Sequence, residues 1–283
     1  MESHFVLTDP LRSDDNAALR LRPSLSSSVS ILDFCFEGNH MHDKLAELAR
    51  DLELAAGSNL LSVILYGSAA SGEFHEQHSD LNLLCLFERL DPEVLARIHP
   101  VTRRWARKGH RPPLVFQASR LAEAADVFAI ELMDIKAGHR VVHGSDLVAP
   151  LDVPLTFHRL QVERELRQSL IRLRQRYLAS DGGGKTLLAL MTASVSSFAV
   201  LFRHAAIAQG APVSELEQPL RKREAFDRLA TMLGFEARPF HIVLDLREGK
   251  KSARDLDAQS IFAEYLTAVS FVVNEIDRRL EGK

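Results

Sequence analysis

Short apolar runs alternate with helix-period segments through the first half of the chain. Three runs have the length of buried strands, and residues typical of turns border them: Leu60–Tyr66, Leu81–Phe87 and Pro113–Gln117. Val127–Ile135 is also almost continuously apolar, and we predict a fourth strand there. These runs indicate a small β-sheet.

Segments with apolar residues at helical spacing lie between or beside some of these runs. From Met41 to about Ala56 the apolar positions recur every three or four residues, and Gly57 is a typical helix stop. A second helix is expected from Asp91 to about Lys108, with a kink or a break at Pro100. The first half therefore predicts an α/β domain.

After about residue 148 the pattern is helical, without a convincing strand. Leucines from Leu166 onward mark one face of a long helix, and further helices are expected at Lys185–Ala208, Pro219–Leu233 and Leu256–Leu280. The predicted fold class is α/β, a small mixed-sheet domain followed by an all-helical bundle. We expect domains at 41–150 and 151–283 after a flexible extension over 1–40, where no periodicity persists.

Composition and charge narrow the class of protein. The chain has 283 residues, a formal net charge of -3 and 46% hydrophobic residues, so we expect no nucleic-acid partner. Two cysteines do not form a disulfide framework, no signal peptide opens the chain, and the apolar stretch from Thr186 to Phe202 is short for a bilayer. We therefore expect a cytoplasmic protein without a membrane segment.

The stretch between the first two predicted strands carries the candidate chemistry. Gly67-Ser68 ends one strand, Ser79-Asp80 precedes the next, and Asn82 lies two residues beyond Asp80. A strand that ends in Gly-Ser brings backbone N–H groups close to phosphates. Side chains two apart on a strand share one face, so oxygen ligands at 80 and 82 can hold one divalent cation.

The segment GSAASGEFHEQHSDLNLL resembles the G-S … S-D-x-D signature of the nucleotidyltransferase superfamily, which includes polymerase beta-like and aminoglycoside nucleotidyltransferases. The resemblance covers roughly residues 43–144. It implies that Gly67 and Ser68 contact the phosphates of a nucleoside triphosphate and that Asp80 binds Mg²⁺. It also implies transfer of a nucleoside monophosphate to a hydroxyl acceptor, which could be a small molecule or a protein side chain.

Asn82 departs from the family pattern at the second metal-binding acid. An amide oxygen can ligate a cation but carries no charge, so magnesium binding and catalysis should be weaker than with a carboxylate. The alternative is a catalytically impaired relative that binds a nucleotide or a partner protein.

The third acid of such a site should come from a neighbouring strand. Glu131 interrupts the apolar run Val127–Met133, where an isolated charge is costly, and we choose it as catalytic residue and metal ligand. Asp134 is the reserve candidate, although it would face the other side of a regular strand.

Other signals carry less weight. GGGKT at Gly182–Thr186 lacks the first glycine and the preceding strand of a phosphate-binding loop. The histidine pairs, His75 with His78 and His139 with His143, lack the context of a zinc site. Arginines on the helix after residue 160 favour a solvated face, with a minority interpretation in which some face the triphosphate; they are Arg164, Arg167, Arg172, Arg174 and Arg176.

Overall fold

The computed structural model describes residues 31–70, 81–212 and 221–280. In these parts of the chain a four-stranded sheet has the order β3-β2-β1-β4. The strands are β1 (Leu60–Tyr66), β2 (Asn82–Phe87), β3 (Leu114–Gln117) and β4 (His139–Gly144). β1 pairs antiparallel with both β2 and β4, and β3 runs parallel to β2. The sheet is therefore mixed, as the sequence predicted.

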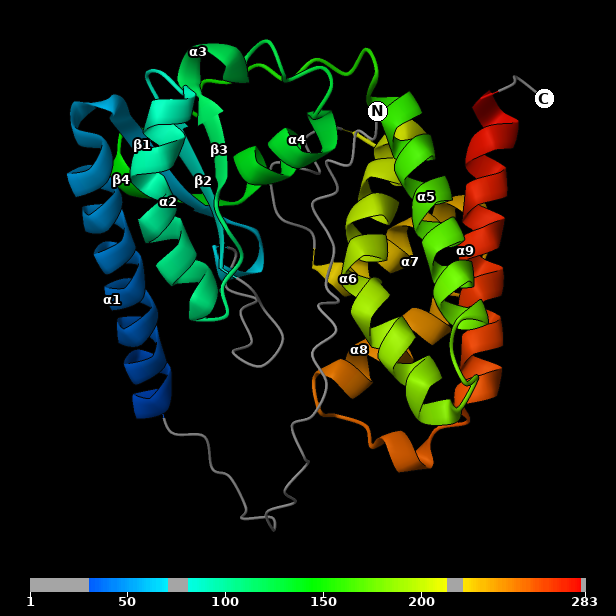
Figure 1. Ribbon diagram of the computed structural model, residues 1–283. Coiled ribbons are helices and arrows are strands. Elements are labelled where there is room, and N and C mark those ends of the chain that lie inside the picture. The colour runs from blue at the N-terminus through cyan, green and yellow to red at the C-terminus, as the bar shows by residue number, and fades with distance from the viewer. Residues whose placement is uncertain (1–30, 71–80, 213–220, 281–283) are drawn as a thin grey trace.

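Two helices cover one face of the sheet. α1 (Ile31–Ala56) and α2 (Pro92–Arg107) pack against the side that carries Val63, Leu65 and Cys85 (Figure 1). α2 also connects the parallel strands β2 and β3, which need such a crossover. Burial raises the pKa of the Cys85 thiol to about 12, so this cysteine behaves as an inert core residue.

These helices differ from the predictions at two points. α1 begins at Ile31, inside the stretch expected to be a flexible extension. α2 continues through Pro100 without a break, and Asp91 caps its first turn by accepting a 2.9 Å hydrogen bond from the Val94 amide. Pro100 is exposed, so its ring lies on the solvent side of the helix.

The predicted strand Val127–Ile135 is wrong: α4 (Ala129–Ala137) occupies most of it, after the short helix α3 (Ala118–Leu121). Leu132 and Ile135 pack into the sheet core, whereas Ile130 and Met133 pack into the helical core. A helix buried on two sides is apolar nearly all round, which hides the helical period. The fourth strand is β4, which follows α4.

The second half of the chain is helical, as predicted. Its helices are α5 (His158–Leu178), α6 (Gly184–Ala208), α7 (Lys222–Leu233), α8 (Arg238–Arg247) and α9 (Ala258–Leu280). Short 3₁₀ turns lie at Gly57–Asn59, Gly67–Ala69 and Ala253–Asp255. α8 was not predicted, and of the predicted Pro219–Leu233 helix the part from Lys222 is seen while 219–220 lie outside the described residues.

An aromatic cluster forms the centre of the helical core. Phe202 meets Phe226 and Phe240 edge to face, with ring centroids 5.5 and 5.2 Å apart, and Phe226 stacks on Phe240 at 4.4 Å. α6 is long and apolar enough to span a membrane, with 50% of its most apolar window buried inside the structure. Its apolar residues include Phe202 and thus serve the bundle core.

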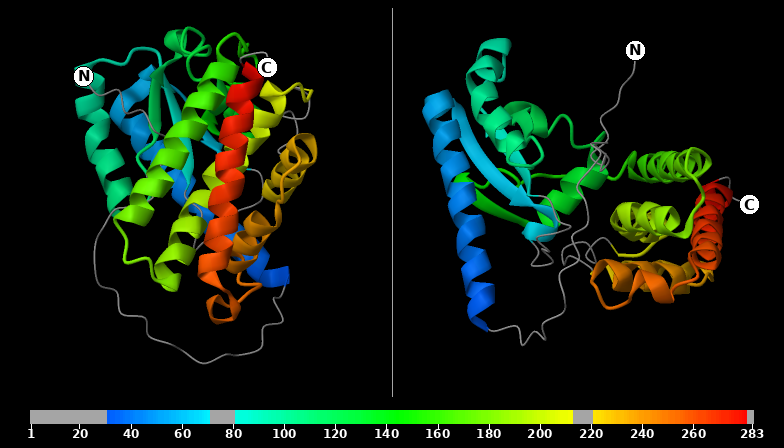
Figure 2. Two further views of the ribbon diagram at one scale, coloured as in Figure 1. Left: turned by 90° about the vertical axis from the view of Figure 1, so that its right-hand side faces the viewer. Right: turned by 60° about the horizontal axis from the view of Figure 1, so that its bottom comes forward.

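α4 lies between the sheet and the bundle. The right-hand view of Figure 2 shows this helix on the sheet face opposite α1, next to α5 and α6. Gln161 of α5 holds its N-terminal end: its amide donates to the Val127 carbonyl at 2.5 Å and accepts from the Ile130 amide at 3.3 Å. The placement of α4 decides where the acidic side chains of this segment lie.

Candidate functional site

The Gly-Ser turn follows β1 directly and is tightly packed against the next strand. Gly67 has φ +75°, a conformation that L side chains rarely adopt. A Cβ at Gly67 would lie 3.1 Å from Nδ2 of Asn82, so the glycine allows the Asn82 amide to approach the turn. Ser68 is half-buried in the same turn. The structure thus brings together three of the five predicted site residues.

Asn82 begins β2 and lies beside Tyr66, its partner across the antiparallel ladder. Because side chains alternate along a strand, Asn82 shares a sheet face with Leu84, which packs under α4. Tyr66 packs on this same cluster. The Asn82 side chain therefore faces the side of the sheet that α4 covers.

Glu131 reaches this face from α4 and not from a strand. Burial raises the pKa of the Tyr66 hydroxyl, the positive charge of Arg111 opposes this, and the negative charge of Glu131 adds to it. Sequence reasoning missed Tyr66 and Arg111. Tyr66 alternates with Ile64 at the strand end, which was an available signal; Arg111 lies in an irregular segment, which offered none.

The Glu131 carboxyl has an unusual proton affinity. Burial raises its pKa to about 7; its own backbone N–H opposes this, and the neighbouring carboxylates of Glu165 and Asp134 add to it. Gln161 donates to Glu131 across 3.4 Å, which gives the ionised form little support. A carboxyl that exchanges its proton near neutral pH can act as a general base or bind a cation.

Asp134, the reserve candidate for the third acid, lies on the helix α4 and not on a strand. On a helix, residues three apart share a face, so Asp134 and Glu131 lie on the same side of α4 and not on opposite sides. Asp134 pairs with Arg203 and accepts a 2.8 Å hydrogen bond from Nε2 of His204, both on α6. It serves the interface between α4 and the bundle.

A second histidine extends this buried polar network. Nε2 of His158 lies 2.9 Å from Nδ1 of His204, and both rings are buried. Nε2 of His204 donates to the Asp134 carboxylate, and the second hydrogen bond joins the two imidazole rings. Burial would raise the pKa of Asp134, but His204 and Arg203 outweigh it, and the pKa is lowered.

Asp80, the predicted catalytic acid and metal ligand, lies outside the described residues, as do His75 and His78. The four described strands contain no Asp or Glu, and no group of three or more potential metal-binding side chains occurs in the described ranges. The described residues offer Mg²⁺ the Glu131 carboxylate and the Asn82 amide oxygen, which alone do not make a magnesium site.

The discounted motifs have other roles. A helix, α5, precedes Gly182–Thr186, so the strand of a phosphate-binding loop is missing there. His139 lies on β4 and pairs with Asp146 at 3.0 Å. His143, on the same strand, lies 3.9 Å from Glu53.

No family model and no curated protein matches the chain. Among solved structures, the chain is similar to the spectinomycin adenyltransferase AAD(9) from Enterococcus faecialis, a structure with ATP and spectinomycin. The identity is 12%, the match covers 83% of this chain and 98% of that one, and the TM-score is 0.38. A similarity at this level does not establish a shared fold or activity.

Proposed function

We propose that the chain is a nucleotidyltransferase-like protein that transfers a nucleoside monophosphate from a nucleoside triphosphate to a hydroxyl acceptor. The observation that carries the proposal is the position of Glu131. Its negative charge raises the pKa of Tyr66, which ends β1 directly before the Gly67-Ser68 turn and pairs with Asn82 across the ladder. A turn that approaches phosphates, as we expect of Gly67-Ser68, and a carboxyl whose pKa burial raises to about 7 are two parts that such a transfer needs.

The residues have separate roles in this proposal. Gly67 and Ser68 approach the phosphates, and the ionised Glu131 accepts the proton of the attacking hydroxyl. Asp80 and Glu131, with Asn82 as a weaker ligand, would hold Mg²⁺, which supplies positive charge against the phosphates. Asp80 would add a second carboxylate to that of Glu131. The acceptor is a small molecule or a protein side chain in the cytoplasm.

The first experiment is calorimetric titration of the natural protein with ATP and GTP, each with and without Mg²⁺. Magnesium-dependent binding is expected. Asp80→Ala and Glu131→Gln should weaken it, whereas Glu123→Gln, a carboxyl with 62% of its side chain exposed, is the matched control and should leave it unchanged. Equal binding of nucleotide by the natural protein and all three variants would contradict the proposed site.

A catalytically impaired relative that only binds nucleotide or a partner protein is the second candidate. The absence of carboxylates from the four described strands and the amide at Asn82 favour it. Asn82→Asp separates the two functions, because a restored carboxylate should raise the affinity for Mg²⁺-ATP by about tenfold, or ~1.4 kcal/mol. Pyrophosphate release by Asn82→Asp but not by the natural protein would identify the impaired form; release by both would identify an active transferase.

A further inference from the structure

The outward face of α5 carries most of the exposed large apolar side chains. Of the nine large hydrophobic residues that the described parts of the chain leave exposed, six belong to α5 or to the segment directly before it. They are Leu155, Phe157, Leu160, Ile171, Tyr177 and Leu178. Single exposed apolar residues are ordinary on a protein surface, whereas a group of them on one element marks a contact surface.

Six residues of α5 form a line along this face, which we call the outer seam. In chain order they are Leu160, Arg164, Arg167, Ile171, Arg174 and Leu178, at alternating steps of four and three residues. Steps of this kind keep side chains on one side of an α-helix, and they are the spacing through which two helices pack lengthwise. Leu160, Ile171 and Leu178 have exposed fractions of 63%, 51% and 80%. The outer seam therefore has the spacing for contact with a second helix over about 27 Å.

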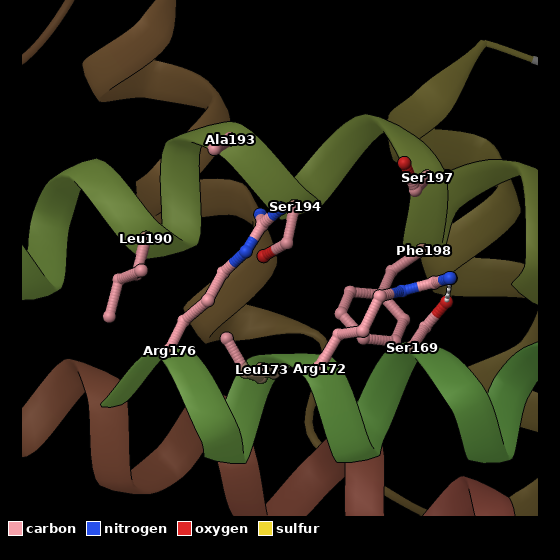
Figure 3. Close-up of a pocket in the computed structure, with 9 residues that line it drawn as sticks. All are labelled: Ser169, Arg172, Leu173, Arg176, Leu190, Ala193, Ser194, Ser197 and Phe198. Atoms are coloured by element: carbon pink, nitrogen blue, oxygen red, sulfur yellow. Dashed lines mark hydrogen bonds between the residues drawn. The ribbon is translucent and has the colours of Figure 1, made fainter. Parts of the chain in front are cut away.

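The opposite side of α5 already has its partners. Val162, Leu166 and Leu173 are buried in the helical core, and α6 and α9 pack against α5. The left-hand view of Figure 2 shows α5 and α9 side by side at the surface of the bundle. In Figure 3, Arg172, Leu173 and Arg176 point from α5 toward α6 around a small cavity of about 40 Å³. α5 thus has two apolar sides, and within the described part of the chain only one of them is covered.

The charges on the outer seam are positive. Arg167 pairs with Glu163 at 2.8 Å and with Asp277 of α9 at 2.6 Å. Arg164 and Arg174 are exposed, and neither has an acidic partner among the described residues; Arg174 donates a 3.2 Å hydrogen bond to a serine hydroxyl of α9. Two cations of the seam are therefore available to carboxylates of a partner.

The same charges disfavour a second copy of this chain as the partner. An antiparallel pair of α5 helices that brings Leu160 of each copy next to Leu178 of the other also brings Arg164 next to Arg174, because both pairs are centred on position 169. A parallel pair places each arginine beside its own counterpart. Like charges directly opposite each other weaken an interface. A different helix with carboxylates opposite the arginines avoids this repulsion.

We propose that the outer seam binds an acidic amphipathic helix of another protein. The apolar residues of the seam pack against apolar residues of that helix at the same spacing, and Arg164 and Arg174 pair with aspartates or glutamates beside them. The apolar stems of the arginines add to the contact. This surface is independent of the proposed transfer reaction, which uses the Gly67-Ser68 turn and Glu131.

The probe is a fluorescently labelled synthetic helical peptide with leucines at alternating steps of four and three residues and glutamates beside them. Its length is about 21 residues, or ~30 Å, enough to cover the seam. The matched peptides are one with lysine in place of each glutamate and one with the acidic sequence scrambled. Titration with the full chain, followed by fluorescence anisotropy, should show binding of the acidic peptide and at least tenfold weaker binding of the other two.

Variants of the chain test the seam residues directly. Ile171→Glu should weaken binding of the acidic peptide at least tenfold, and Arg164→Glu/Arg174→Glu should reverse the preference in favour of the lysine peptide. The matched control is Leu54→Glu on α1, where the leucine is 85% exposed, and it should change the affinity less than twofold. All these side chains are exposed, so the midpoint of thermal unfolding should stay the same in every variant.

Several results would overturn the proposal. They include no binding of the acidic peptide, equal binding of the three peptides, and equal affinity of the natural protein and Ile171→Glu. Vesicles of phosphatidylcholine and phosphatidylglycerol that bind the natural protein but not Ile171→Glu, in the absence of peptide binding, would identify a membrane surface instead. A dimer of the natural protein and a monomer of Ile171→Glu in sedimentation equilibrium would identify a second copy as the partner.

Discussion

Asp134→Asn should destabilise the protein strongly, because it removes the carboxylate that pairs with Arg203 and His204, two buried side chains on α6. Arg203 is 9% exposed and His204 is 0% exposed, so solvent cannot replace the lost carboxylate. Breaking a buried ion pair from one side costs about 3–5 kcal/mol. A typical domain has a total stability of about 5–15 kcal/mol, so the variant should unfold at a much lower denaturant concentration.

Equilibrium urea unfolding at pH 7.5, followed by far-ultraviolet circular dichroism, measures this loss. Glu123→Gln is the matched control, because it breaks an ion pair with Arg120 whose side chains are 69% and 62% exposed. Exposed pairs contribute about 0–1 kcal/mol, and the control should remain within that range. A larger loss in Asp134→Asn than in Glu123→Gln shows that the effect comes from the burial of the ion pair and not from the loss of a carboxylate as such.

A double variant distinguishes the pair from packing. Asp134→Leu/Arg203→Met removes both charges and should be more stable than Asp134→Leu alone, because no unpaired guanidinium remains in the interface. A loss below about 1 kcal/mol in Asp134→Asn would refute the view that this interface depends on a buried charge pair. A double variant less stable than the single one would refute it as well.

Three further predictions concern protons and backbone. Burial lowers the pKa of His158 to about 4, so as the pH falls the unfolded chain binds this proton before the folded protein does. The contribution of His158 to stability should therefore be complete above about pH 6.5 and should be lost toward pH 4. His158→Gln should flatten this part of the plot of urea midpoint against pH. Because burial raises the pKa of Glu131 to about 7, magnesium-dependent ATP binding should strengthen as the pH rises from 6 to 8. Glu131→Gln should abolish this pH dependence. An affinity that does not change with pH in the natural protein would contradict the role of Glu131 as a metal ligand. Gly67→Ala should lower the free energy of unfolding by about 1–3 kcal/mol and weaken nucleotide binding by displacing Asn82. Gly57→Ala is the control, because Gly57 also has a positive φ but has open space around it, and this variant should lose stability alone. Equal losses of nucleotide binding in the two variants would exclude a role for the contact with Asn82.

The sequence was sufficient for the elements whose pattern is local. β1 and β2 are short apolar runs between polar turns, and they were predicted closely. The long helices α5 and α9 followed from their spacing, because each buries one face and shows the other to solvent, whereas α6 followed from a long apolar stretch and is buried all round over Leu201–Ile207. The division into domains at residue 150 stays a prediction.

α4 shows where the local pattern is insufficient. Its stretch is rich in Ala, Leu, Met and Glu, which favour a helix, but burial between two cores removed the amphipathic period. The predicted strand placed Asp134 and Glu131 on opposite faces, whereas the helix places them on the same side. A strand separates residues three apart, whereas a helix brings them together.

The sequence by itself determined the Gly67-Ser68 turn with Asn82 on the following strand, because these residues are neighbours along the chain or across one hairpin. Only the tertiary structure decided the rest of the site. Glu131 reaches the face of Tyr66 because α4 lies between two cores, and the outer seam of α5 stays exposed because α6 and α9 pack on other sides of that helix. Those contacts join residues far apart in the chain, and no local spacing encodes them.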